Sequence, residues 1–309
     1  MANKLHLSVS PHIHTKQTVQ SIMLDVIIAL LPATVAGVII FGTRALLVVA
    51  VCVFACVASE FLFNKIVKKE QSVADLSAVV TGIILALNLP ANIPLWQAVI
   101  GSVFAIIIVK CFFGGMGCNL VNPAATARVF MIIAFGSMAT SAMPVNVDAV
   151  SSATPLTQLT NGTTPDLSTL LIGNYGGAIG ETCTLALLLG GIYLLAKRII
   201  TWHIPTAFIG TVFVFTLLLN DFSFTIATAS ILSGGLFLGS IFMATDYVTS
   251  PATPFGKLLC GLLAGIITVA IRNWGAYPEG VSFAILILNI LDPYIDIWTA
   301  RRVFGGKKL

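Results

Sequence analysis

Charged residues are scarce in this chain of 309 residues, where Asp, Glu, Lys and Arg together make up 9% of the sequence. Apolar residues account for 57%, and the mean hydropathy is +1.00. This balance excludes an ordinary soluble domain and is typical of a polytopic membrane protein surrounded by lipid. The formal net charge of +4 does not indicate nucleic-acid binding, because the basic residues lie at the ends of apolar runs, where they set topology.

The sequence also lacks the patterns of metal-binding and dinucleotide-binding proteins. Its six cysteines are scattered, mostly inside or beside apolar runs, so we interpret them as small apolar side chains at helix interfaces. We therefore predict no bound metal, no iron–sulfur cluster and no catalytic residue in this chain alone. We also expect no cleavable signal, because the first apolar run is long enough to remain as a spanning helix.

Ten apolar runs are candidates for membrane spans. Their approximate bounds are 22–41, 45–64, 76–89, 95–113, 123–143, 181–197, 204–220, 225–243, 257–274 and 281–298. If the N-terminus is cytoplasmic, only Arg44 and Arg272 among the basic residues lie on the outer side. We therefore predict an all-α, multi-pass protein of the cytoplasmic membrane, with about ten transmembrane helices and both termini in the cytoplasm.

Two predicted spans are interrupted, at 88–94 and at 243–254. The segment Pro90-Ala-Asn-Ile-Pro94 has a loose echo five spans later in Pro251-Ala-Thr-Pro254, and an odd offset inverts the second copy, so we predict two inverted five-helix repeats. Such breaks point to an internal site, although prolines that merely end helices at the surface explain them equally well. The predicted parts are a cytoplasmic lead-in, the first repeat, an outer loop, the second repeat and a cytoplasmic tail, at 1–21, 22–143, 144–180, 181–298 and 299–309.

The outer loop, 144–180, is the longest connection between apolar runs, and it contains no Lys or Arg. It is therefore predicted to face away from the cytoplasm. Near its start lies the polar pattern Asp148-x-x-Ser-Ser-Ala-Thr154. Such residues are common in turns and at helix starts, so the pattern alone leaves an ordinary turn and a functional motif both open.

A glycine-rich stretch at 114–128 contains Asn122-Pro123, which favours the start of a helix whose positive end faces an acceptor. Arg128, about one turn into that helix, is interpreted either as the partner of an anionic cofactor or of Asp246, or as a residue that only sets topology. Asp246 is predicted to be a functional carboxylate, because a charged side chain inside the membrane costs free energy and usually marks a functional site. Three others are predicted to lie close to span ends: Asp25, Glu60 and Glu181.

Four motifs occur in order along the chain. They are Ser10-Pro-His12, Gly114-Gly-Met-Gly-x-Asn-x-x-Asn-Pro-Ala124, Ser151-Ser-Ala-Thr-Pro-Leu156 and Met243-Ala-Thr-Asp-x-Val-Thr-Ser-Pro251. Through them, essentially the whole chain resembles the RnfD family of membrane proteins, which belong to Rnf complexes, the ion-translocating ferredoxin:NAD oxidoreductases. It also resembles the related membrane protein of the sodium-translocating NADH:quinone reductase, which has an N-terminal extension that this chain lacks.

The resemblance implies a urea-transporter-like fold, assembly with Rnf subunits A, B, C, E and G, and covalent FMN attached by a flavin transferase. The FMN would form a phosphoester with Thr154. Asp148 and Ser151 would be recognition residues, and Ala153 the small neighbour that admits the transferase. Ser152 stands where the family usually has Gly. The resemblance also implies a non-covalently bound riboflavin.

An outer flavin raises the question of how electrons reach it from a cytoplasmic donor, across a hydrocarbon layer about 30 Å thick. An intermediate carrier is needed, supplied either by partner subunits or by a second, non-covalent flavin in this chain. We place this second site between the interrupted segments 88–94 and 243–254 and the helix start at Asn122, with Arg128 and Asp246 as the nearby charged residues.

The leading functional hypothesis is a flavin-carrying membrane subunit of a complex that couples electron transfer between ferredoxin and NAD to translocation of Na⁺ or H⁺. In that hypothesis the flavin performs the redox chemistry, and the protein binds and orients it. One alternative is a urea-channel-like solute transporter without a redox role, and another is a passive scaffold. Both alternatives would lack bound flavin, and the scaffold would show no solute flux.

Overall fold

The computed structural model describes residues 17–135, 144, 154–160, 165–173, 175–275 and 279–300. In this part of the chain the regular structure is helical, and the one β-bridge joins Pro90 and Ala178. The predicted all-α class is confirmed. The elements are α1 (Val19–Phe41), α2 (Thr43–Val67), η1 (Val73–Asp75), α3 (Ser77–Leu87), α4 (Leu95–Val103), η2 (Phe104–Cys111), α5 (Pro123–Ala134), α6 (Pro155–Thr160), α7 (Leu167–Ile172), α8 (Thr184–Ala196), α9 (His203–Leu219), α10 (Phe224–Leu232), α11 (Leu236–Leu238), η4 (Gly239–Met243), α12 (Pro254–Trp274) and α13 (Val281–Thr299).

Among the described residues, four helices are long and apolar enough to cross a membrane: α1, α2, α12 and α13. A fifth forms if α10 and α11–η4, which bend by 62° at a short break, count as one span. Shorter apolar helices occupy the other predicted runs: α3, α4 with η2, α5, α8 and α9. These lengths and compositions are those of a polytopic membrane protein.

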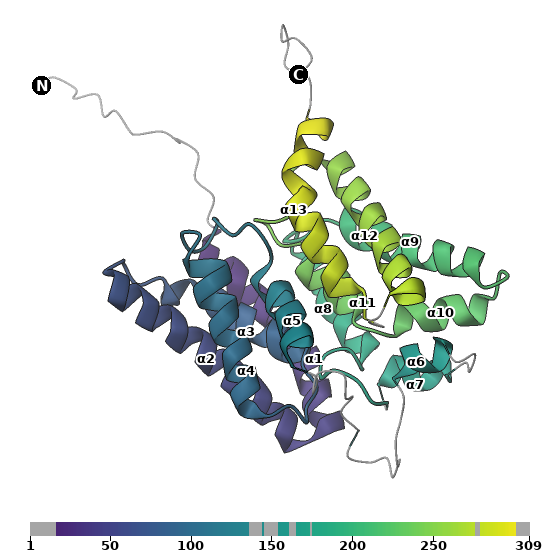
Figure 1. The fold of residues 1–309 in the computed structure, drawn as a ribbon, viewed down its shortest axis with the longest axis horizontal. Coiled ribbons are helices and arrows are strands. Elements are labelled where there is room, and N and C mark those ends of the chain that lie inside the picture. The colour runs from purple at the N-terminus through teal and green to yellow at the C-terminus, as the bar shows by residue number, and fades with distance from the viewer. Residues whose placement is uncertain are drawn as a thin grey trace, which may run out of the picture.

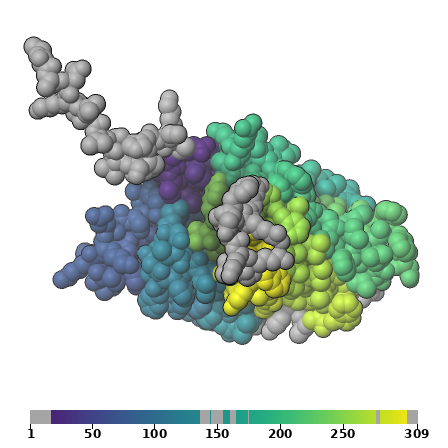
Figure 2. Space-filling model, turned by 90° about the horizontal axis from the view of Figure 1, so that it is seen from above, coloured from purple at the N-terminus to yellow at the C-terminus, as the bar shows by residue number. Residues whose placement is uncertain are grey.

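The chain is arranged as two groups of helices that lie side by side, α1–α5 and α8–α13 (Figure 1). They contact each other through α1 against α8 and through α5 against α13. Seen from the end where α13 finishes, the two groups occupy opposite sides of the molecule (Figure 2). The short helices α6 and α7 lie at the other end (Figure 1).

The exterior of the helices is apolar, as is the core. Leu30, Leu85 and Phe208 are fully buried, whereas Phe54 and Ile66 on α2 are 75% and 78% exposed. Exposed large apolar side chains on long apolar helices indicate a surface in contact with lipid.

Glycines allow the closest helix contacts. On α12, Gly261 and Gly265 lie four residues apart and face α9, and a Cβ at Gly261 would be 2.8 Å from the carbonyl oxygen of Ile204. On α8, a Cβ at Gly190 would lie 2.1 Å from the carbonyl oxygen of Ala29 on α1. Small residues that let backbones approach are a common means of packing helices in membranes.

Two helix starts follow directly from the sequence. The side-chain oxygen of Asn122 accepts from the backbone N–H groups of Ala124 and Ala125 and caps α5, which begins with a proline. Thr253 caps α12 in the same way, accepting from the N–H of Gly256. The predicted helix start at Asn122-Pro123 is confirmed, because the cap satisfies backbone donors and proline fits the first turn.

Candidate functional site

Polar contacts gather at two opposite ends of the helices. We call one end the Lys110 face; it is formed by segments 112–122 and 244–253 and by the end of α13, to which Ala252 is tied by a 3.0 Å hydrogen bond from its N–H to Asp296 Oδ1. We call the other end the Thr154 face; it is formed by segment 88–94, by α6 and by the break between α10 and α11.

A cavity of about 440 Å³ lies at the Lys110 face between the two groups of helices. Its walls come mainly from apolar side chains of α1, α3, α8 and η4, and its polar side chains include those of Asn119, Lys110 and Asp246. Asn122 also lines it. A largely apolar cavity of this size with a few converging polar groups is typical of a site for an organic cofactor.

The interrupted segment at 243–254 reaches this cavity through Thr245 to Val248, but segment 88–94 does not. Segment 88–94 lies at the Thr154 face, where Arg44 donates to the carbonyl of Ile93 at 3.1 Å and the N–H of Ile179 donates to the carbonyl of Leu89 at 3.0 Å. The two interrupted segments nevertheless meet at their first residues, where Asn88 donates to Met243 Sδ at 3.5 Å, and they diverge from there to opposite faces. Of the predicted elements of the second site, the cavity includes the second interrupted segment and the helix start at Asn122 but not segment 88–94.

Arg128 also lies away from the cavity. Its guanidinium pairs with the carboxylate of Glu279 at 2.5 Å, and not with Asp246 as one interpretation of the sequence required. Asp246 lines the cavity and accepts a hydrogen bond from the Thr249 hydroxyl at 3.2 Å. The sequence did not reveal Glu279 as the partner, because it lies 151 residues away along the chain.

Asn122 and Asn119 contribute to the cavity in different ways. The Asn122 side chain caps α5 and donates to the carbonyl of Met243 at 3.1 Å, so it holds two walls together. The Oδ1 atom of Asn119 is buried and has no hydrogen-bond partner in the described structure. An unpaired buried acceptor costs about 1–3 kcal/mol. The unpaired oxygen of Asn119 therefore favours a bound ligand that brings an N–H or O–H donor. The sequence motif that contains Asn119 did not reveal this role.

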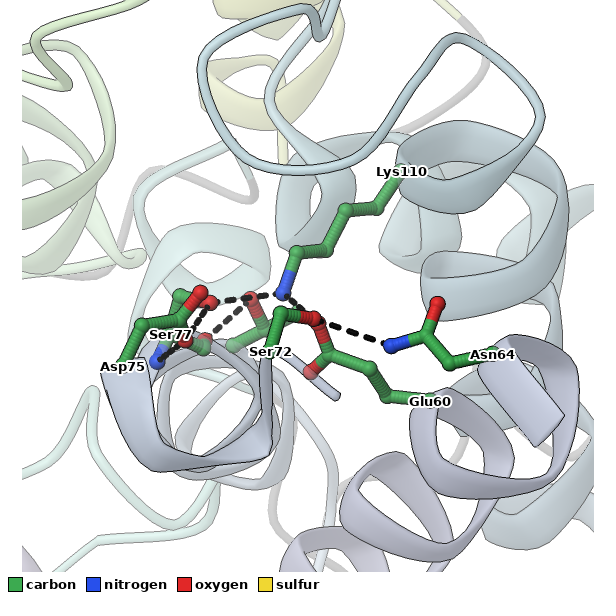
Figure 3. A network of polar contacts seen from close by, with 7 residues as sticks. Glu60, Asn64, Ser72, Asp75, Ser77 and Lys110 are labelled. Carbon is green, nitrogen blue, oxygen red and sulfur yellow. Dashed lines mark hydrogen bonds and ion pairs between the residues drawn. The ribbon is translucent and has the colours of Figure 1, made fainter. Parts of the chain in front are cut away.

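A buried ion pair between α2 and η2 lies at the cavity, and Figure 3 shows the pair with its polar neighbours. The Nζ atom of Lys110 lies 2.7 Å from Glu60 Oε1 and 2.6 Å from Ser77 Oγ. Both charged side chains are only 2% exposed. Lys110 and Ser77 line the cavity and Glu60 does not. The sequence predicted that Glu60 lies near a span end, where its charge costs little free energy. In the structure Glu60 is fully buried within α2, and Lys110, 50 residues away along the chain, compensates its charge.

Thr154 lies at the opposite face and immediately precedes α6. Its side chain is half-buried, and its hydroxyl oxygen is 3.2 Å from that of Thr157. The other residues of the predicted attachment motif lie outside the described residues: Asp148, Ser151, Ser152 and Ala153. Of the predicted attachment motif, the structure therefore describes only Thr154.

The neighbour of α6 is a helix break that the sequence did not predict, at 233–235. Leu156, on α6, lies beside Gly234. The buried guanidinium of Arg272 donates to three carbonyls there, those of Ser230, Ser233 and Gly234, at 2.8, 3.2 and 2.8 Å. Arg272 thus satisfies carbonyl groups that the break leaves without helical partners.

The chain matches the NQR2, RnfD, RnfE family over residues 6–305. It belongs to this family. Curated relatives of similar length support the assignment: the chain is 46% identical over 316 residues to the D subunit of the Na(+)-translocating ferredoxin:NAD(+) oxidoreductase complex of Acetobacterium woodii, with 99% of this chain and 98% of the relative covered. The resemblance to RnfD is thereby confirmed.

Other members of the NQR2, RnfD, RnfE family are similar over the same extent. The D subunit of the proton-translocating ferredoxin:NAD(+) oxidoreductase complex of Clostridium ljungdahlii is 38% identical, with 99% of this chain and 98% of the relative covered. The D subunit of the ion-translocating oxidoreductase complex of Aliivibrio salmonicida is 34% identical, with 97% and 98% covered. The similarity thus covers both groups of helices, the cavity and the Thr154 face.

Proposed function

We propose that the chain is the flavin-carrying membrane subunit of an Rnf-type complex in the cytoplasmic membrane, which couples electron transfer between ferredoxin and NAD to translocation of Na⁺ or H⁺. The observation that carries this proposal is the 46% identity, over 99% of the chain, to a complex subunit with that activity in its name. The chain acts with the other Rnf subunits and is not catalytic alone.

The first flavin is FMN, joined through its phosphate to the Thr154 hydroxyl by a flavin transferase. The hydroxyl lies at the start of a short helix, outside the long apolar helices, where an enzyme has access. Bound there, flavin supplies one- and two-electron exchange. The protein supplies the tether, and it supplies a rigid base in α6, which packs against α10.

The second flavin is non-covalent and occupies the cavity at the Lys110 face. The apolar walls suit a flat aromatic ring, and Asn119 Oδ1 is the buried acceptor for one of its donors. Asp246 is the carboxylate of the same site, and Asn122 holds the walls in place. With one flavin at each face, electrons would cross the membrane by way of two cofactors bound to this one chain.

The ten-span topology with two inverted repeats is part of this proposal. Support comes from equivalent helices five spans apart, α1 with α8 and α5 with α13, which contact each other as they would if they lay next to a pseudo-two-fold axis. In the first half, Arg44 after α1 bonds to the break at Ile93. In the second half, Tyr247 in the other break bonds to Ile199 after α8. The two pairs lie at opposite faces, as inversion requires.

The test of the covalent flavin is fluorescence of the denatured subunit in a gel. Thr154→Ala is expected to abolish the fluorescent band while the protein remains in the membrane. Thr157→Ala is the matched control, because it removes the neighbouring hydroxyl and should leave the band in place. Peptide mass spectrometry that located FMN on another residue would contradict the assignment.

The test of the second flavin is acid extraction of the purified complex, followed by quantification of the released flavin per copy of this subunit. We expect about one non-covalent flavin, and we expect Asn119→Leu to reduce its retention, because the buried acceptor is lost. A complex that transfers electrons but releases no flavin would assign the crossing to the partner subunits.

A further inference from the structure

We propose that Lys110 and Glu60 form an oriented charge pair that stabilises the reduced, negatively charged form of the ligand in the cavity. This inference rests on the proposed non-covalent flavin and names the residue of this chain that sets its reduction potential. Lys110 is the positive end of the pair and lines the cavity, whereas Glu60 does not line it. Figure 3 shows the pair and the side chains that bind it.

The ammonium group has a donor left for a ligand. Lys110 carries three N–H donors, of which one goes to Glu60 Oε1 and one to Ser77 Oγ. Within the described part of the chain, no third acceptor binds it. The side chain is 2% exposed, so its charge is not screened by bulk water. A ligand in the cavity is therefore the natural partner of the third donor.

The pair is held in a fixed orientation from both ends. Ser77 Oγ donates to Asp75 Oδ1 at 2.5 Å, and the Ser77 N–H donates to the same oxygen at 2.8 Å. At the other end, the Ser72 hydroxyl donates to Glu60 Oε1 at 2.7 Å, and Asn64 donates to Ser72 at 3.0 Å. Charges fixed before the reaction stabilise developing charge without the cost of reorientation.

The sign of the effect follows from the order of the charges. Reduced ferredoxin, through the complex, delivers two electrons to the ring; one proton enters with them, and one negative charge stays on the ring. Because Lys110 is nearer to the cavity than Glu60, attraction by the ammonium exceeds repulsion by the carboxylate. The carboxylates of Asp246, which lines the cavity, and of Asp75, which accepts from the Ser77 hydroxyl, oppose the effect, so among these described side chains Lys110 is the group that favours reduction.

The experiment uses the purified complex and spectroelectrochemical titration of the non-covalent flavin. Glu60→Gln/Lys110→Met removes both charges and leaves no unpaired buried ion, so it is expected to bind flavin with a lowered midpoint potential. Glu60→Gln alone leaves the ammonium beside Ser77 and the Asp75 carboxylate, so the midpoint should rise. Lys65→Met is the control, because Lys65 is exposed on the same helix as Glu60 and its removal should leave the potential unchanged.

The expected change in each direction is at least tenfold in the ratio of reduced to oxidised flavin at a fixed potential, or about 30 mV for a two-electron couple. Flavin content, measured by acid extraction of the same samples, separates the two proposals. Variants that retain flavin at unchanged potential would overturn the role of the pair and leave the flavin site intact. Wild-type complex without non-covalent flavin would overturn both. A purely structural pair predicts loss of protein or flavin, and no opposite shifts.

Discussion

Replacing Lys110 by methionine should destabilise the protein strongly, because it leaves Glu60 as a buried carboxylate without a cation. The two side chains are 2% exposed and 2.7 Å apart. One carboxylate oxygen, Glu60 Oε2, already has no hydrogen-bond partner in the described structure, and without Lys110 the other oxygen would keep only the hydrogen bond from the Ser72 hydroxyl. Removal of one member of a buried pair typically lowers the free energy of unfolding by about 3–5 kcal/mol.

The matched variant removes both charges. Glu60→Gln/Lys110→Met should lower the free energy of unfolding by only about 1 kcal/mol, because loss of the pair also removes the cost of burying two ions. The difference between the double variant and the sum of the two single variants then measures the coupling, about 5–9 kcal/mol if each single change costs about 3–5 kcal/mol. Reversible unfolding in mixed detergent micelles gives these values. A cost below about 1 kcal/mol for Lys110→Met, or additivity of the two single changes, would refute the view that the pair is a compensated buried charge.

Two further predictions concern topology and packing. In a background without the exposed Cys118, cysteines placed at Thr163 and Lys308 should react with impermeant reagents from opposite sides of the membrane, and reaction from one side only would refute the ten-span topology. Gly190→Val should separate α8 from α1 and lower the unfolding free energy by about 1–3 kcal/mol, whereas Gly210→Val, whose Cβ meets no atom within 4 Å, should not; equal losses in detergent unfolding would contradict the close-approach argument.

The helices could be predicted well from the sequence, because each apolar run is a local signal of burial in lipid. The start of α5 followed from Asn122-Pro123 for the same reason: a cap is made by neighbours in the chain. The break at 233–235 was missed, because its Ser-Gly-Gly sequence interrupts an apolar run without a proline or a charged residue, and its stabilising residue, Arg272, lies far along the chain.

The candidate site was predicted only in part. Asn122 and Asp246 do line one cavity, because each stands beside an interrupted or newly started helix. Arg128 does not, because its partner is set by tertiary packing against the loop that carries Glu279. The pairing of Glu60 with Lys110 was equally hidden, since composition gives the charge of each residue and not which helices bring them together.

The π-helical geometry of η2, which carries Lys110, has a consequence for how relatives should be aligned. A π-helical stretch is an α-helix with one residue inserted, kept where the altered register serves a function. Deleting one residue from the stretch, such as Ile107, should therefore restore an ordinary α-helix and leave the residues at its end in nearly the same phase, because the wider π-helical turn absorbs the extra residue. The Lys110 ammonium would then keep its place at the cavity. A relative with a one-residue gap between 104 and 111 is therefore expected to keep a cation at the position that aligns with Lys110 once the gap is placed inside the π-helical stretch.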